Sequence, residues 1–240
     1  MKKLNLIYAL ALLSVFTSCK KEAKQQPPPG KPAVAATVSD SVSYTVDGKT
    51  YTAGGMGIGN SSSGGEDANR RVVFPDSTKM YAYGLVGNAD SIMHFQESRI
   101  LSTSASIDIF FVKKFIKQPR VTYWPPLKDV LTLFTVGKHP YAEDFGWQNS
   151  ENGIAFDISA SNKRYSSYNA YNGIYTIAMQ PGFQKNSTFE IISFTPASVG
   201  YNLEAKFTAM VIDKATGEQK KLENGYLRLN IAPGYRDDGN

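Results

Sequence analysis

Side chains able to perform covalent catalysis are scarce in this chain, which has one cysteine and two histidines among 240 residues. Nucleophilic hydrolysis needs a base beside a serine or thiol, so His94 and His139 are the bases to consider, and no G-x-S-x-G motif accompanies them. His94 alternates with apolar neighbours in SIMHF, which predicts a strand position. His139 follows a predicted helix, whose C-terminal dipole favours a histidine there. We therefore predict no nucleophilic catalytic site.

Metal and phosphate sites have equally little support. His139, Glu143 and Asp144 lie within six residues, but Pro140 interrupts any helix that would align them, and no second histidine is near. The glycine-rich run at residues 54–59 follows a strand, as a phosphate loop would, yet it continues into NSSSGGED and not into a helix. We predict neither a metal nor a cofactor.

Glycoside hydrolysis requires only two carboxylates roughly 5 to 10 Å apart. Candidate carboxylates stand in predicted strands, at Asp108, Asp157, Glu190 and Glu204. A solvated strand face explains each of them more simply. A carboxylate-based hydrolase of glycosides or other polysaccharides therefore remains an alternative function.

Two aromatic segments could bind a ligand. Tyr165, Tyr168 and Tyr171, with Trp147 nearby, predict an exposed surface that stacks on a sugar, although tyrosines in hairpins also serve ordinary packing. The segment FFVKKFIKQPR mixes lysines and an arginine with phenylalanines and could face an anionic lipid or glycan. A strand end with a solvated face is the simpler interpretation of this second segment. Its residues of interest are Lys113, Lys114, Lys117, Arg120, Phe111 and Phe115.

The N-terminus has the layout of a secretory signal peptide. Lys2 and Lys3 precede a run of mostly apolar residues from Leu4 to Phe16, and small residues follow before Cys19. A helix over this run would rise about 20 Å, short of the roughly 30 Å hydrocarbon core of a bilayer. We predict that residues 1–18 are a cleaved signal and that the mature chain has no transmembrane helix.

The stretch VFTSC resembles the lipobox of bacterial lipoproteins. This resemblance implies cleavage before Cys19 and acylation of its thiol and amino group by chains such as palmitate, which together hold a protein stably on a membrane. Two other interpretations remain open. Cys19 could be incidental in an ordinary signal peptide, or the apolar run could be an uncleaved anchor.

The composition of residues 19–36 predicts a flexible tether. The segment consists mainly of Lys, Gln, Pro, Ala and Gly and has no aromatic residue, so it cannot form a hydrophobic core. The signal and tether hold six lysines and one glutamate. The remaining residues 37–240 therefore hold 20 basic and 20 acidic side chains out of the chain's 26 and 21. A neutral domain gives no support to nucleic-acid binding.

The rest of the chain predicts a single all-β domain over residues 37–240. In SVSYTVDGKTYTA, Asp47 and Gly48 suit a two-residue type I′ turn, and pairing outward from it sets Tyr44 opposite Tyr51 on a buried face. A second hairpin is predicted around Asn172 and Gly173. Further short strands are separated by turn signals at residues 87–88, 152–153, 216–217 and 224–225.

This spacing favours an antiparallel β-sandwich or barrel-like domain. One segment departs from the strand pattern. Leu127, Val130, Leu131 and Phe134 recur at helical spacing after Pro126, which predicts one short helix of about ten residues with a glycine, at position 137, in the C′ position. This helix is expected to cover one end or edge of the sheet.

The order of YTVDGKTYTA, VGKHPYAEDF, NGIAFDISASNKRYSS and KFTAMVIDKATGEQKKLENGYLRLNI resembles small Bacteroidetes lipoproteins with β domains of unknown function. The resemblance implies a cell-envelope compartment and no particular reaction. Asp-Ser followed by an apolar residue or Thr also resembles the O-glycosylation sequence of such envelope proteins. It occurs at Ser41, Ser77 and Ser91.

We therefore expect a lipid-anchored protein of the outer membrane, on its periplasmic face or at the cell surface. Its β domain is expected to be a non-catalytic binding or accessory module, with a glycan or an envelope protein as partner. The alternatives are the carboxylate-based hydrolase and an envelope inhibitor or structural spacer.

Overall fold

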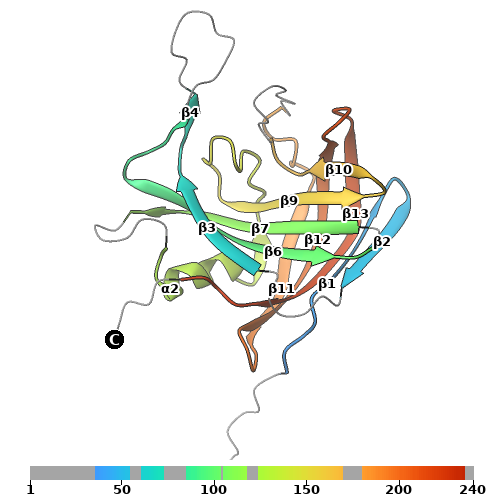
Figure 1. Ribbon diagram of the computed structural model, residues 1–240, viewed down its shortest axis with the longest axis horizontal. Helices are drawn as coiled ribbons and strands as arrows, with labels where there is room; N and C mark the ends of the chain where they lie inside the picture. Colours follow the sequence, from blue (N-terminus) through green and yellow to red (C-terminus); the bar gives the residue numbers. More distant parts are fainter. Residues whose placement is uncertain are drawn as a thin grey trace, which may run out of the picture. The chain divides into compact units, whose positions relative to one another are not determined.

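The computed structural model describes residues 36–54, 61–72, 85–103, 105–117, 124–169 and 180–235 (Figure 1). All of these residues belong to one compact unit, Val34–Asn240. The predicted signal peptide, Cys19, nearly all of the tether, Ser77, Arg120, Tyr171 and the predicted hairpin at residues 172–173 lie outside the described residues. Within the described part of the chain, no helix has the length and apolar character needed to span a bilayer.

The fold is all-β with one short helical segment, as the sequence predicted. The strands are β1 (Ser41–Val46), β2 (Lys49–Gly54), β3 (Ser61–Asp67), β4 (Arg71–Val72), β5 (Leu85–Val86), β6 (Ser91–Leu101), β7 (Ala105–Ile116), β8 (Gly137–His139), β9 (Gly153–Ala160), β10 (Lys163–Ser166), β11 (Thr188–Pro196), β12 (Tyr201–Asp213) and β13 (Gln219–Ile231). The helical segment consists of α2 (Leu127–Val130) and the 3₁₀ turn η1 (Leu131–Phe134).

Eleven strands form one antiparallel sheet, whose main order is β2-β1-β13-β12-β10-β9-β7-β6-β3. β11 pairs with β12 and β8, outside this path, while β4 and β5 pair with each other. β2, at one end of the order, packs near β6 and β7 towards the other end, so the sheet curls around its inner face (Figure 1). The curled sheet forms a half-barrel, which confirms the expectation of an antiparallel β-sandwich or barrel-like domain.

The first hairpin is confirmed in register. Tyr44 pairs with Tyr51, and the turn between the strands has positive φ angles at Asp47 (51°) and Gly48 (71°). These are the conformations that a type I′ turn requires. The alternating side chains of both strands then reach the core on one face. The buried residues of this hairpin are Val42, Tyr44, Val46, Tyr51 and Ala53.

The expectation of a turn at residues 224–225 is wrong, because both residues lie inside β13. Asn224 has a φ of 54°, and the pairing with β12 shifts register opposite this point, which makes a β-bulge. A Cβ on Gly225 would lie 2.5 Å from the ring of Phe207. The turn that joins β12 to β13 is the other predicted one, where Gly217 has a φ of 78°.

The helical segment is shorter than expected and changes pitch. Eight residues are helical, and the second half is a 3₁₀ turn. Three residues per turn place Leu133 below Val130, so Leu133 is buried where the sequence predicted Leu131. Gly137 is not at C′, because the turn ends at Phe134 and Gly137 opens β8. The segment packs on β7, with the Phe134 and Phe111 rings 5.1 Å apart.

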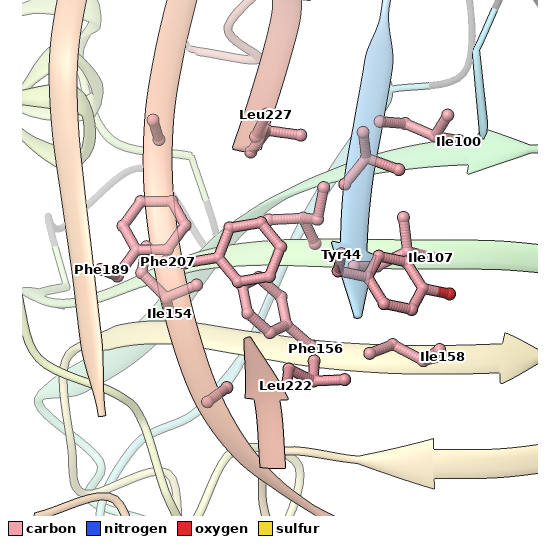
Figure 2. Packing of buried hydrophobic residues seen from close by; sticks show 14 of the residues in the cluster. Tyr44, Ile100, Ile107, Ile154, Phe156, Ile158, Phe189, Phe207, Leu222 and Leu227 are labelled. Carbon is pink, nitrogen blue, oxygen red and sulfur yellow. The ribbon is translucent and has the colours of Figure 1, made fainter. Parts of the chain in front are cut away.

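The main core fills the inner face of the curled sheet. Figure 2 shows Tyr44, Phe156, Phe189 and Phe207 converging from β1, β9, β11 and β12. Burying each of these large side chains contributes about 1.5–3 kcal/mol. A second, smaller cluster lies apart from the main core and includes Met93, Phe145 and Tyr168. Both clusters are built from residues 42–231, so this part of the chain carries its own core.

Candidate functional site

A cleft of about 360 Å³ opens where the end of β7 meets α2 and η1. We call it the Trp124 cleft. Its wall combines the rings of Phe115 and Trp124 with the polar side chains of Lys113, Asp129 and Thr132. The cleft lies at the low end of the roughly 300–1,000 Å³ range of ligand pockets, and it has the mixture of apolar walls and few polar groups that such pockets share.

Trp124 is 38% exposed, yet it is fixed along one side. Its ring meets the buried His94 ring edge-on, with centroids 5.9 Å apart, and His94 meets Phe115 edge-on at 6.2 Å. The chain after β13 also passes close by, since a Cβ on Gly234 would lie 2.9 Å from Trp124 and 1.8 Å from the Ser63 hydroxyl. The Gly234 amide donates a hydrogen bond to Gln96 Oε1 at 3.0 Å. Trp124 is therefore a fixed and partly open ring.

Local sequence explains how the polar groups reach the same cleft. Pro126 is extended (ψ 153°) and starts the helical segment, which places Asp129 in its first turn and Thr132 one turn later. Lys113 Nζ donates a hydrogen bond to Thr132 Oγ1 at 2.7 Å and lies 5.8 Å from the centre of the Phe115 ring. Thr132 in turn donates to the Asp129 carbonyl at 2.5 Å.

The basic segment at the end of β7 divides between several environments. Lys113 and Lys117 line the Trp124 cleft, and Lys117 Nζ forms an ion pair with Asp67 at 3.2 Å. Lys114 donates hydrogen bonds to the Ser150 carbonyl and to Asn69. Strand alternation separates Lys113 from Lys114, so the segment does not form one continuous basic face.

A second, more open groove of about 500 Å³ is lined by His139, Glu143 and Glu151. The Glu143 carboxylate accepts hydrogen bonds from the Gly182 and Gln184 amides at 2.7 and 3.0 Å. Glu151 accepts one from the Glu143 amide. Partial burial raises the pKa of Glu151, and the nearby Asp144 and Glu143 carboxylates add to this effect. Both glutamates therefore hold the backbone of the turns that form this groove.

The residues weighed as metal ligands have structural partners. The Asp144 carboxylate accepts hydrogen bonds from the Ser150 amide and hydroxyl and from the Glu151 amide. His139 lies in β8, with Nε2 2.6 Å from the Thr135 carbonyl, to which it donates. Among the described residues, no group of three or more His, Cys, Asp or Glu side chains is placed to hold a metal ion.

Asp108 and Asp157 stand directly opposite each other on β7 and β9. Arg99 donates to both oxygens of Asp108, at 2.6 and 3.1 Å. Asp157 pairs with Lys214 Nζ at 2.6 Å and accepts a hydrogen bond from the Tyr168 hydroxyl at 3.2 Å. Neither aspartate lines the Trp124 cleft or the groove at Glu143. These contacts are those of a charged strand face.

The two candidate glutamates also lie on strand faces. Glu190 stands opposite Lys206 on one neighbouring strand and Lys138 on the other. Glu204 accepts a hydrogen bond from the Tyr226 hydroxyl at 2.8 Å and pairs with Arg228 at 3.3 Å. The four carboxylates therefore do not converge in either cleft.

The prediction of an exposed tyrosine surface is wrong for Tyr165 and Tyr168, which are 3% and 8% exposed. Tyr165 pairs with Ile158 and joins the main core. Tyr168 packs edge-on against Phe145, with ring centroids 5.5 Å apart. Trp147 is partly buried in the turn at residues 143–148. The strand alternation and the covering turn bury rings that the sequence pattern left free.

Other predicted positions lie in ordinary strand environments. His94 is a fully buried strand residue, as expected. Ser41 and Ser91 are partly buried first residues of β1 and β6. Sequence reasoning missed Trp124, Asp129 and Thr132 as parts of a site. The signal for them was a tryptophan placed directly before two prolines and a short helix, next to the aromatic and basic end of a strand.

No protein-family model matches this chain, and comparison with curated proteins and with solved structures returned no match.

Proposed function

We propose that this chain is a lipid-anchored protein of the bacterial cell envelope whose β domain is a non-catalytic binding module. The observation that carries the binding role is the Trp124 cleft, where a fixed and partly open indole stands beside a lysine, a hydroxyl and a carboxylate. Such convergence of ring and polar groups is typical of ligand sites.

The carboxylates that a hydrolase would use support the same proposal. Asp108 and Asp157 are engaged by Arg99, Lys214 and Tyr168, and they do not line the cleft. A general acid for glycoside cleavage must reach the glycosidic oxygen, so an ion-paired aspartate on a strand face is poorly placed for that role.

The anchoring role follows from the lipobox-like stretch at Cys19 and the resemblance to Bacteroidetes lipoproteins. The first described residues of the β domain, at 36–38, are held by one side chain of β12. Asn202 donates a hydrogen bond to the Ala36 carbonyl at 2.7 Å and accepts one from the Val38 amide at 3.0 Å. Two hydrogen bonds to one side chain therefore fix residues 36–38 at the start of β12. The proposed membrane is the outer membrane, with the domain on its periplasmic face or at the cell surface.

The anchor is tested by replacing Cys19 with serine in the full chain. We expect loss of acyl-chain labelling and of membrane association, while the domain stays folded. Retention of both properties in the Cys19→Ser protein would refute the lipoprotein assignment.

The binding role is tested with residues 34–240, which contain both cores. We expect this domain to be retained by envelope or plant polysaccharides without degrading them, and Trp124→Ala to abolish retention. Release of reducing ends or ester hydrolysis, lost on Asp157→Asn or Glu190→Gln, would overturn the proposal in favour of a hydrolase.

A further inference from the structure

We propose that the Trp124 cleft binds an uncharged sugar. One face of the sugar ring stacks on Trp124, and neighbouring sugar hydroxyls form hydrogen bonds with Lys113 and Asp129. This inference rests on the proposed binding role and names its ligand class.

The stacking surface is the first observation. Trp124 keeps 38% of its surface open although His94 and the chain at Gly234 fix its other side. An aromatic face carries negative charge at its centre, whereas the C–H face of a sugar ring is apolar and slightly positive. A flat ring held in place before the ligand arrives reduces the entropy lost on binding.

The arrangement of donors and acceptors is the second observation. Lys113 Nζ has three donor hydrogens, and Thr132 accepts one of them. Among the described residues, the Asp129 carboxylate has no hydrogen-bond or ion-pair partner. A sugar hydroxyl both donates and accepts, so two neighbouring hydroxyls can accept from Lys113 and donate to Asp129 at the same time.

The charge of the cleft is the third observation. Lys113 and Asp129 carry opposite charges, and the other lysine in the wall, Lys117, is paired with Asp67 at 3.2 Å. The charges of the described wall residues are therefore close to balanced, and a polyanion would meet the Asp129 carboxylate as well as Lys113. Repulsion between the anionic ligand and the Asp129 carboxylate would make binding less favourable. The balance favours an uncharged sugar over a uronate, a sulfated glycan or a nucleic acid.

The test uses residues 34–240 with Trp147→Phe, so that Trp124 is the only tryptophan left. Cellohexaose, laminarihexaose, maltohexaose and mannohexaose serve as uncharged probes, with heparin and polygalacturonate as anionic ones. We expect a saturable change of Trp124 fluorescence with at least one uncharged probe, and a weaker or absent one with the anionic probes.

The variants are compared by calorimetry with the best probe. Trp124→Ala is expected to weaken binding by about tenfold or more, in line with the loss of a stacking ring. Asp129→Asn and Lys113→Met are each expected to weaken it several-fold. The matched controls are Glu190→Gln and Lys138→Met, which lie opposite each other on β11 and β8, and they are expected to leave affinity unchanged.

The outcomes separate the two proposals. Tighter binding of heparin or polygalacturonate, improved by Asp129→Asn, would overturn the uncharged-sugar inference and leave the binding role intact. No saturable response to any uncharged probe would also overturn this inference. Cleavage of a probe would instead overturn the proposed non-catalytic function.

Discussion

Two aromatic clusters in this domain share the same type of ring packing but differ in their exposure to solvent. The covered cluster consists of Phe95, Phe110, Phe145 and Tyr168, and the open cluster of His94, Phe115 and Trp124. Each uses edge-on rings. Each also has a lysine over a ring at 5.8 Å, Lys214 over Tyr168 and Lys113 over Phe115.

The clusters differ in what lies over the rings and in what the lysine meets. The turn at residues 143–148 places Phe145 over the covered cluster, 4.9 Å from Phe110, and Lys214 there is neutralised by Asp157. In the open cluster, Lys113 meets the uncharged Thr132 and Trp124 stays partly exposed. Similar ring packing therefore ends in buried rings in the covered cluster and in a partly exposed indole in the open cluster.

The largest expected effect lies in the covered cluster. Tyr168→Ala removes a buried ring and its hydrogen bond to Asp157, so the free energy of unfolding should fall by about 3 kcal/mol or more. Urea denaturation measures the loss, and Tyr168→Phe is the matched control, with an expected loss of about 1 kcal/mol. A loss under about 1 kcal/mol for Tyr168→Ala would mean that the ring is not a packing element.

Gly234→Ala should disturb the open cluster on the packed side of the Trp124 ring. The added methyl group meets Trp124 and Ser63, and such overpacking costs about 1–3 kcal/mol. Acrylamide quenching of Trp124, measured in the Trp147→Phe background, should increase because the ring is pushed outward. Adding Ser63→Gly should restore part of the stability. Unchanged quenching and stability would show that Gly234 does not hold the ring.

Trp124→Ala should change stability by only about 1 kcal/mol, because the side chain is partly exposed. The same substitution should weaken ligand binding by about tenfold or more, whereas Tyr168→Phe should leave the affinity unchanged. Urea denaturation and the retention assay together check this separation. A loss of stability as large as that of Tyr168→Ala would remove the distinction between the two clusters.

The smallest effect concerns Tyr44, a buried tyrosine of the main core. Its hydroxyl has no hydrogen-bond partner among the described residues, so Tyr44→Phe should leave stability at pH 7 unchanged or slightly raised.

Burial raises the pKa of Tyr44, and the neighbouring Tyr51 and Tyr165 add to the shift. The unfolded state ionises above about pH 10, whereas the folded state keeps the proton until its raised pKa is reached. Ionisation of this group therefore does not affect the free energy of unfolding below about pH 10, and it lowers that free energy progressively as the pH rises further. Urea midpoints between pH 8 and 12 should fall less steeply for Tyr44→Phe. Equal slopes would contradict the raised pKa.

Much of the fold was predictable from local sequence. The turn at Asp47 and Gly48 fixed the register of the first hairpin because both residues accept positive φ. The same logic failed at Asn224, where a positive φ produced a bulge inside β13 and not a turn. A local conformation was correct there, but only the long pairing with β12 decides whether the chain reverses.

The candidate site was less predictable, because exposure depends on contacts between distant residues. The sequence pattern predicted Tyr168 as an exposed ligand residue. In the structure it is covered by Phe145, which lies 23 positions earlier in the chain. Trp124 is brought beside His94 and Gly234, which are far from it in sequence. A local sequence pattern does not indicate which ring a distant turn will cover. The tyrosines were therefore predicted as an exposed binding surface, and Trp124 was missed.

The most direct test of the open cluster as the ligand site is the response of the two indole N–H signals in the NMR spectrum of residues 34–240. The chain has only Trp124 and Trp147, so the two signals are assigned with one Trp→Phe variant. On addition of a binding oligosaccharide, we expect the Trp124 signal to move with saturation and the Trp147 signal to stay. Movement of Trp147 alone, or of neither signal with a ligand that calorimetry shows to bind, would contradict the account.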